Sequence, residues 1–312
     1  MSLEFNNFIN GISFPKENII RILQDNKING EIISINYSNF KKVFIKIEEN
    51  KKTYLLKLCL DDYSIALTDN ENKGYLHLNK FNKSKFNLLN FELIIINSDY
   101  SLSKIDFIEG RKGKYLEHNK FFNYRNKLTE YYLEDYISAI KNKFNINDLV
   151  QDQIINNLLK FKDLKIPLDV SHGDFIHWNT IKGLKENYVI DLEFFEKERP
   201  YFYDNFHWFL TPIINKAMGF NIKFLLINSP CSIIIKILKL SLKNEYSQNV
   251  IKDNNLFKIL FILFILERYL VLDEIINLKN IDDLVDQKEK KQTLKHMNIL
   301  FKLLLKFTKD AF

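Results

Sequence analysis

The sequence predicts an α+β protein with two parts, a smaller one built on an antiparallel sheet and a larger one that is mainly helical. Short β-rich runs are concentrated before residue 110, and long segments with helical spacing of apolar residues dominate after it. A chain of 312 residues, 46% of them hydrophobic, is also long enough to bury a core in each of two domains. We therefore expect domains at 1–110 and 111–312.

The first part begins with three short strands in residues 31–60, EIISINYSNFKKVFIKIEENKKTYLLKLCL. Polar turns separate the three runs, which is typical of an antiparallel meander. One helix and two further strands are expected over 68–81, 91–97 and 102–110. Five strands with one inserted helix make a small α+β domain.

The second part is predicted to be mostly helical, with a strand expected in the run NYVIDLEFF at 187–195. Its helices are expected over 119–143, 148–162, 204–218, 231–247, 255–278 and 287–309. Lys258 and the pair Glu267-Arg268 interrupt the most apolar stretch, which favours a buried core helix over a membrane span. The basic C-terminal helix is expected to pack on this domain, with contact to an anionic membrane surface as the alternative.

Composition excludes several classes of protein. Cys59 and Cys231 are the two cysteines, too few for a disulfide framework or a zinc site, which fits a reducing compartment. The first residues, MSLEFNNFINGIS, lack the basic and apolar stretches of a signal peptide, so we expect a soluble cytoplasmic protein. The net charge of +6 is scattered among acids, which argues against nucleic-acid binding. Composition leaves the oligomeric state open.

The stretch SHGDFIHWNT at 171–180 places a histidine, an aspartate and an asparagine close together. Asn179 and the later Asp191 offer the oxygen ligands that Mg²⁺ accepts. Asp174, on the same loop as Asn179, is placed to accept a proton from an attacking hydroxyl. These groups suit phosphoryl transfer, in which positioning and charge neutralisation do most of the work.

The text HGDFIHWN at 172–179, followed by IDLE at 190–193, resembles the signature of the aminoglycoside phosphotransferase and choline kinase-like family, which is related to protein kinases. The resemblance implies a bilobal protein kinase-like fold, ATP as the phosphoryl donor with GTP as the alternative, and Mg²⁺. It implies Asp174 as the catalytic base and Asn179 and Asp191 as metal ligands.

Within this family the sequence is most similar to a bacterial branch, from which it departs in two places. His177 stands where that branch often has proline, and Leu192 stands where it often has tryptophan. Neither change removes a reactive group. The family fold implies a nucleotide-binding domain at 1–110 that ends in a hinge, and a catalytic loop and acceptor site in 111–312.

A kinase-like nucleotide site needs a lysine on the third strand, oriented by a glutamate on the helix that follows. Lys57 in TYLLKLCL and Glu71 in TDNENKGYLHL match these requirements. A glycine-rich loop is missing after the first strand, so Ser38 and Asn39 are expected to cover the phosphates. The family hinge reads adenine through backbone groups, which makes Phe107, Ile108 and Glu109 cofactor candidates by position.

Other residues near the motif are expected to support it. We expect the His172 ring to hold the loop that carries Asp174 through hydrogen bonds to backbone carbonyls. Glu193 is expected to act behind the metal ligands, with direct metal contact as the alternative. Asp204 is expected to cap a helix, with acceptor binding as the alternative. Trp178 is expected in the core, and His177 is either exposed or an acceptor-site residue.

The leading prediction is an ATP- and Mg²⁺-dependent O-phosphotransferase that acts on a small-molecule hydroxyl. Basic residues outnumber acidic ones in 195–312, which disfavours a polycationic acceptor. A neutral or anionic hydroxyl compound is favoured: a sugar, a sugar phosphate or a cell-surface glycan precursor. One alternative is an aminoglycoside or choline-type kinase. Another is a catalytically silent nucleotide-binding scaffold.

Overall fold

The computed structural model describes residues 14–38, 42–80, 87–114, 129–217, 236, 250, 252–278 and 284–311. These residues form two compact units, each made of separated segments. Unit 1 takes its residues from Met1–Gly113, Trp178–Phe195 and Ile281–Lys288. Unit 2 takes them from Lys114–His177, Glu196–Asn280 and Glu289–Phe312. The first segment of unit 1 ends close to the expected boundary at residue 110, but unit 1 also takes in Trp178–Phe195 and Ile281–Lys288, which were expected in the second domain.

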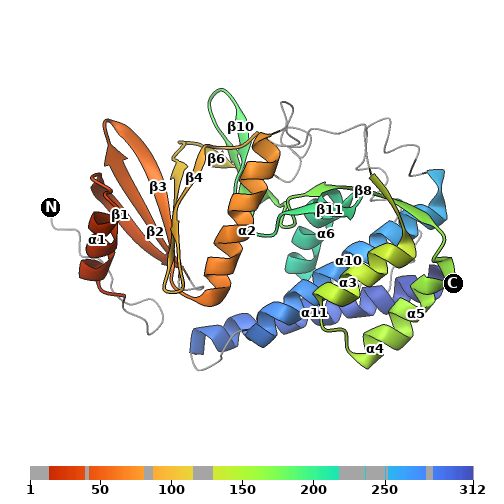
Figure 1. Cartoon of the computed structure of the whole chain (residues 1–312). Helices are drawn as coiled ribbons and strands as arrows, with labels where there is room; N and C mark the ends of the chain where they lie inside the picture. Colours follow the sequence, from red (N-terminus) through yellow and green to blue (C-terminus); the bar gives the residue numbers. More distant parts are fainter. Residues whose placement is uncertain are drawn as a thin grey trace. The chain divides into compact units, whose positions relative to one another are not determined.

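Unit 1 is built on a five-stranded antiparallel sheet with the strand order β1-β2-β3-β5-β4 (Figure 1). The strands are β1 Glu31–Ser38, β2 Lys42–Glu49, β3 Lys52–Cys59, β4 Phe91–Ile96 and β5 Ser101–Asp106. The predicted five strands and the meander of the first three are therefore confirmed, and with them the α+β class.

One face of this sheet is covered by helix α1, Lys16–Asp25, which the predicted elements do not include. Ile19 and Leu23 lie four residues apart, on one side of the helix, and pack against the buried side chains of β2 and β3. Ile45 and Leu56, which face each other across β2 and β3, are completely buried in this cluster. Alternating apolar residues in the strands thus create the core that α1 closes.

Helix α2, Asp62–Asn79, begins six residues before the predicted start at residue 68. The cause is a capping box, in which the Asp61 carboxylate accepts from the Ser64 backbone N–H at 2.7 Å and the Ser64 hydroxyl accepts from the Asp61 N–H. Because the helix starts early, Glu71 lies in its middle rather than at its opening.

A second sheet of unit 1 has the order β10-β9-β6, from β10 Asn187–Val189, β9 Thr180–Lys182 and β6 Arg111–Lys112. The strand predicted over 187–195 ends at Val189, so most of that prediction is wrong. Asp191 has a φ of 67°, in the left-handed region, which is incompatible with an extended strand.

Unit 2 combines a three-stranded antiparallel sheet with helices. The sheet has the order β11-β8-β7, from β11 Glu196–Pro200, β8 Lys165–Ser171 and β7 Thr129–Tyr132. The long helices are α3 Leu133–Lys143, α6 Tyr203–Ala217, α10 Asn254–Leu278 and α11 Leu284–Ala311, of which α11 belongs to unit 2 from Glu289 on. Short helical turns run from α4 Asp148–Val150 through the π-helical η2 Gln151–Ile155 and α5 Asn156–Leu158 to η3 Leu159–Phe161.

Most of the predicted helices of this unit are confirmed at or near their expected bounds. The helix predicted over 119–143 is wrong at 129–132, where the chain forms β7, and residues 119–128 lie outside the described part of the chain. The helix predicted over 231–247 and Cys231 also lie outside it, except for residue 236.

Helix α10 is a core helix, as its interrupted apolar pattern predicts. Residues 259–266 are buried throughout. Helix α11 buries Leu300, Leu303 and Phe307, and the Phe307 ring meets the Phe261 ring edge-on at 4.8 Å. Among the helices that the structure describes, none is both long enough and apolar enough to cross a membrane.

Candidate functional site

Lys57 of β3 is the centre of a buried group of charges in unit 1. Its side chain is 4% exposed, and its ammonium contacts Glu71 of α2 and, at 2.5 Å, Glu193. Burial by itself would lower the pKa of Lys57, but the charges of Glu71, Glu193 and Asp191 outweigh it and raise that pKa well above its usual value. Lys57 is therefore a permanent cation held by two carboxylates.

A second lysine completes this charge group. Lys42, the first residue of β2, donates to both oxygens of Glu193 at 2.6 and 2.7 Å. Burial alone would raise the pKa of Glu193, but Lys57 and Lys42 lower it below the usual value. Glu193 is thus an ionised carboxylate between two lysines, which fits the expected supporting role.

The segment that carries Glu193 is fixed to helix α2. The Asn70 side-chain amide donates to the backbone carbonyls of Glu193, at 2.8 Å, and Phe195, at 3.1 Å. Gly74, one turn along the helix, lets this segment approach, because a Cβ there would lie 2.8 Å from Cγ of Phe195. Helix α2 thereby positions both Glu71 and Glu193.

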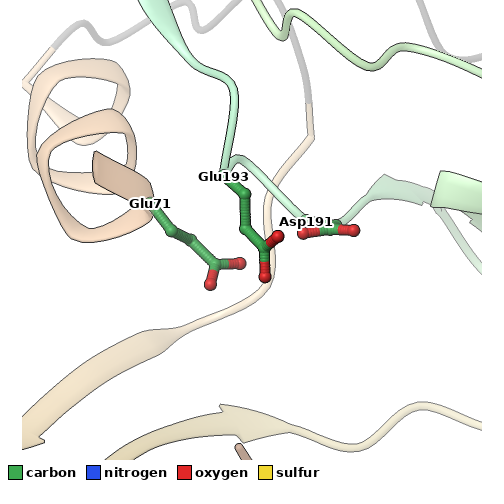
Figure 2. Close-up of side chains that lie close together, drawn as sticks. All are labelled: Glu71, Asp191 and Glu193. Carbon is green, nitrogen blue, oxygen red and sulfur yellow. The ribbon is translucent and has the colours of Figure 1, made fainter. Parts of the chain in front are cut away.

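Asp191 lies beside this charge group but differs from its neighbours. Figure 2 shows the side chains of Glu71, Asp191 and Glu193 close together. One carboxylate oxygen of each lies within 4.8 Å of the others. Burial, and then the charge of Glu193, raise the pKa of Asp191 to about 8. Its Oδ1 atom is buried and has no hydrogen-bond partner among the described residues.

A carboxylate oxygen in this condition fits a divalent cation. A divalent cation would bond to the oxygen that lacks a partner. Its positive charge would also stabilise the ionised carboxylate, which burial disfavours. Asn179, the other predicted ligand, is buried in the same unit, and its backbone carbonyl accepts from the Ile190 N–H at 3.0 Å. This bond ties Asn179 to the residue just before Asp191.

The other residues predicted to contact the nucleotide lie at or just beyond the ends of strands in unit 1. Ser38 ends β1 and pairs in register with Lys42, and Asn39 lies outside the described residues. The Phe107 N–H donates to the Thr53 carbonyl at 3.2 Å, directly after β5. Ile108 and Glu109 follow in the connection to β6. Their roles in nucleotide binding stay predictions.

In unit 2 the loop that carries Asp174 is fixed by Asp204 of α6. The Asp204 carboxylate accepts from the Ser171 hydroxyl at 2.8 Å and from the backbone N–H groups of His172 and Gly173 at 3.0 and 3.1 Å. The helix-capping role expected for Asp204 is wrong, because α6 already begins at Tyr203 and the carboxylate bonds to the loop. Gly173 has a φ of 82°, which glycine adopts at low cost.

His172 also supports this loop. Its ring is completely buried, and Nδ1 accepts from the Asp174 backbone N–H at 3.3 Å. The contact is with a backbone N–H where the sequence led us to expect a carbonyl. Trp178 was expected in the core but is 37% exposed.

Asp174 meets two side chains that sequence reasoning missed. One terminal nitrogen of Arg268 on α10 donates to Asp174 Oδ1 at 3.0 Å, and Nε2 of His207 on α6 lies 3.4 Å from the same oxygen. Burial, and then the Arg268 charge, lower the pKa of His207 to about 4, so this ring is neutral at pH 7. Arg268 thus places a positive charge next to the Asp174 carboxylate.

Arg268 is held in place through its neighbour in the sequence. Glu267 is buried and accepts from Nε of Arg199 on β11 at 2.9 Å and from the Tyr136 hydroxyl on α3. This network connects α10 to α3 and to the sheet of unit 2.

The structure thus brings the predicted residues together in two groups. Lys57, Glu71, Asp191 and Glu193 form one in unit 1, and Asp174, His172 and Asp204 form the other in unit 2. Lys42 was missed because lysine is abundant throughout the chain. Arg268 could have been identified from the sequence, because a charged pair inside a strongly apolar helix requires buried partners.

Comparison with known proteins finds only distant likenesses to solved structures. Neither a family model nor a curated protein matches the chain. Among solved structures, the aminoglycoside phosphotransferase APH(4)-Ia is 10% identical, with 92% of this chain and 99% of that chain covered and a TM-score of 0.45. Spectinomycin phosphotransferase APH(9)-Ia, in complex with ADP and spectinomycin, is 10% identical, with 95% and 98% covered and a TM-score of 0.38. Their names are those of the family that the motif resembles, but at such scores the function has to follow from this chain's own residues.

Proposed function

We propose that the chain is an ATP- and Mg²⁺-dependent O-phosphotransferase that acts on the hydroxyl of a small molecule. The observation that carries the proposal is the acidic group of unit 1, in which Oδ1 of Asp191 has no hydrogen-bond partner within the described part of the chain and lies beside the Lys57–Glu71 ion pair. A phosphate-binding lysine and a cation-binding carboxylate are the two groups that a nucleotide triphosphate needs.

The residues of unit 1 take the nucleotide roles. Lys57, oriented by Glu71, binds the α- and β-phosphates, and Asn179 and Asp191 hold Mg²⁺. When bound, Mg²⁺ neutralises charge on the phosphate oxygens. Glu193 keeps Lys57 and Lys42 in place. ATP is the favoured phosphoryl donor, and GTP is the alternative. The residues at 107–109 are expected to contact the adenine base through their backbone groups.

Asp174 of unit 2 takes the role of general base. It accepts the proton of the acceptor hydroxyl as the oxygen attacks the terminal phosphorus, the bond from that phosphorus to the bridging oxygen breaks, and ADP leaves. Three hydrogen bonds from the loop to Asp204 fix the direction of its backbone. Such positioning contributes to rate because the reacting groups then need little reorganisation.

The test is ADP release from ATP and Mg²⁺ with panels of sugars, amino alcohols and aminoglycosides as acceptors. We expect Asp174→Asn to lower turnover by about 10²- to 10⁴-fold, the usual contribution of a general base, and to leave nucleotide binding intact. Glu274→Gln, an exposed position on α10, is the matched control and should be neutral.

Three outcomes would redirect the proposal. Equal loss of turnover and nucleotide binding in Asp174→Asn would contradict the base role. Turnover restricted to aminoglycosides or amino alcohols would favour that kind of kinase over a sugar or glycan-precursor kinase. Nucleotide binding without turnover on any acceptor would favour a silent scaffold.

A further inference from the structure

Three buried nitrogen atoms in the surroundings of Asp174 need a hydrogen-bond partner that the described residues do not provide. Nε of Arg268, Nε2 of His207 and Nε2 of His296 are all buried and lack a hydrogen-bond partner among the residues that the structure describes. His207 is completely buried and His296 is 8% exposed. Buried polar atoms are rarely left without partners unless a ligand or water supplies them.

The hydrogen bonds of His207 decide what its free nitrogen can do. Nδ1 lies 3.2 Å from the Phe175 carbonyl, which only accepts, so Nδ1 must carry the proton. In the neutral ring Nε2 is then an acceptor. It lies 3.4 Å from Asp174 Oδ1, which is also an acceptor. His207 therefore does not donate to Asp174, and this carboxylate can accept from the hydroxyl of an acceptor molecule.

Arg268 is a cation and needs a negatively charged partner. Its ion pair in the described part of the chain is with Asp174, whereas the adjacent Glu267 is already paired with Arg199. If Asp174 takes a proton during the reaction, it becomes neutral and leaves a largely buried guanidinium without an opposite charge. An uncompensated buried charge is costly, so a second anion is needed close to Arg268.

We infer that Arg268 binds an anionic group of the acceptor molecule, a carboxylate or a phosphate, while the acceptor hydroxyl points to Asp174. This inference rests on the proposed phosphotransferase function and deepens it by naming the class of acceptor. The side chains of Arg268 and Asp174 are 11% and 20% exposed, so both remain accessible to a small molecule.

The distances also limit the shape of the acceptor. Arg268 at 3.0 Å and His207 at 3.4 Å contact the same oxygen of Asp174. The hydroxyl and the anionic group must therefore lie within a few bonds of each other. A hydroxy acid, such as a sugar acid, has this arrangement, whereas a neutral hexose lacks the anion.

The test compares gluconate, glucuronate and glucose 6-phosphate with glucose as acceptors in the full-length chain. The measured quantity is the ratio of kcat/KM for each anionic acceptor to kcat/KM for glucose. We expect Arg268→Gln to lower this ratio by about 10- to 100-fold, because a charge-assisted contact is lost for the anions alone. Lys302→Gln on α11, an exposed site with the same change of charge, should leave the ratio unchanged.

A ratio that Arg268→Gln does not change would overturn the inference, even if all rates fall. That result would assign Arg268 to the transferring phosphoryl group or to the orientation of Asp174. A wild-type preference for glucose would overturn it as well.

Binding without nucleotide separates this inference from the proposed function. At constant ionic strength, gluconate and inorganic phosphate should raise the melting temperature of the wild type and have little effect on Arg268→Gln. If no acceptor is phosphorylated but this difference is seen, the phosphotransferase proposal fails and the anion site stands. If neither anion stabilises the wild type more than the variant, the anion site fails.

Discussion

At the scale of single residues, Asp191 and Asp174 are two similar acids in different surroundings. Asp191 is enclosed beside another carboxylate, and its pKa is raised to about 8. Asp174 is partly exposed and faces the guanidinium of Arg268. The first is suited to a cation that displaces a proton, and the second to an ionised base.

The buried histidines of unit 2 predict a dependence of stability on pH. Burial, and then the charges of Arg268 and His207, lower the pKa of His296 to about 3, and that of His207 is about 4. An unfolded histidine takes up its proton below about pH 6.5. Between these values the unfolded chain binds more protons, so the free energy of unfolding should fall as the pH drops from about 6.5 toward 4.

Replacing His296 tests this reasoning. Across that pH range His296→Gln should lose about 1 kcal/mol per pH unit less stability than the wild type, measured by urea denaturation. The control is His77→Gln, at a partly exposed site of unit 1, which should follow the wild-type profile. Parallel profiles for wild type and His296→Gln would show that the ring is not held neutral by the fold.

At the scale of secondary-structure elements, helix α2 fixes the acidic group of unit 1. Its capping box sets where the helix begins, and its face presents Glu71, Asn70 and Gly74 to the segment at 190–195. A change in how closely the helix approaches that segment would move Glu193, and with it Lys57.

Gly74→Ala should therefore destabilise the protein, although alanine favours helix formation by about 1 kcal/mol. The new Cβ would lie 2.8 and 2.9 Å from side-chain atoms of Phe195, and overpacking of this kind costs about 1–3 kcal/mol. We expect a net loss of up to about 2 kcal/mol by chemical denaturation. Lys73→Ala, at the exposed adjacent position, should change stability much less. A Gly74→Ala variant more stable than the wild type would show that the segment yields freely.

The elements also show what the sequence could predict. Alternating apolar residues and polar turns were enough for the five strands, because these signals are local. Asp61 and Ser64 also indicate the start of α2 in the sequence, but the apolar pattern placed the predicted start at residue 68. Strand β7 depends on pairing with β8, more than thirty residues away, so no local signal could specify it.

At the scale of the whole molecule, the candidate site could be predicted in part. The motif gave Asp174, Asn179 and Asp191, since their spacing along the chain carries the information. Lys42 and Arg268 are defined by partners 151 and 94 positions away, which no spacing rule covers.

Ligand binding should report on the whole molecule through its stability. A nucleotide at a hundredfold its dissociation constant stabilises the folded chain by about 2.7 kcal/mol. We expect ATP to raise the melting temperature, and Mg²⁺ to increase the shift in the wild type but not in Asp191→Asn. The asparagine should fold well, because burial already favours the neutral acid at this position. If Mg²⁺ increases the melting-temperature shift as much in Asp191→Asn as in the wild type, Asp191 is not a ligand of the cation.

The two units are composed of separated stretches, and this composition affects how the protein is made. During synthesis, Lys42 and Lys57 leave the ribosome long before Glu193, which is 151 and 136 positions further along. Until that acid arrives, two lysines destined for burial lack a shared counter-charge, so the first unit cannot reach its final form. A truncated gene product ending at Gly113 would retain the sheet-forming sequence but not the acid that neutralises its interior.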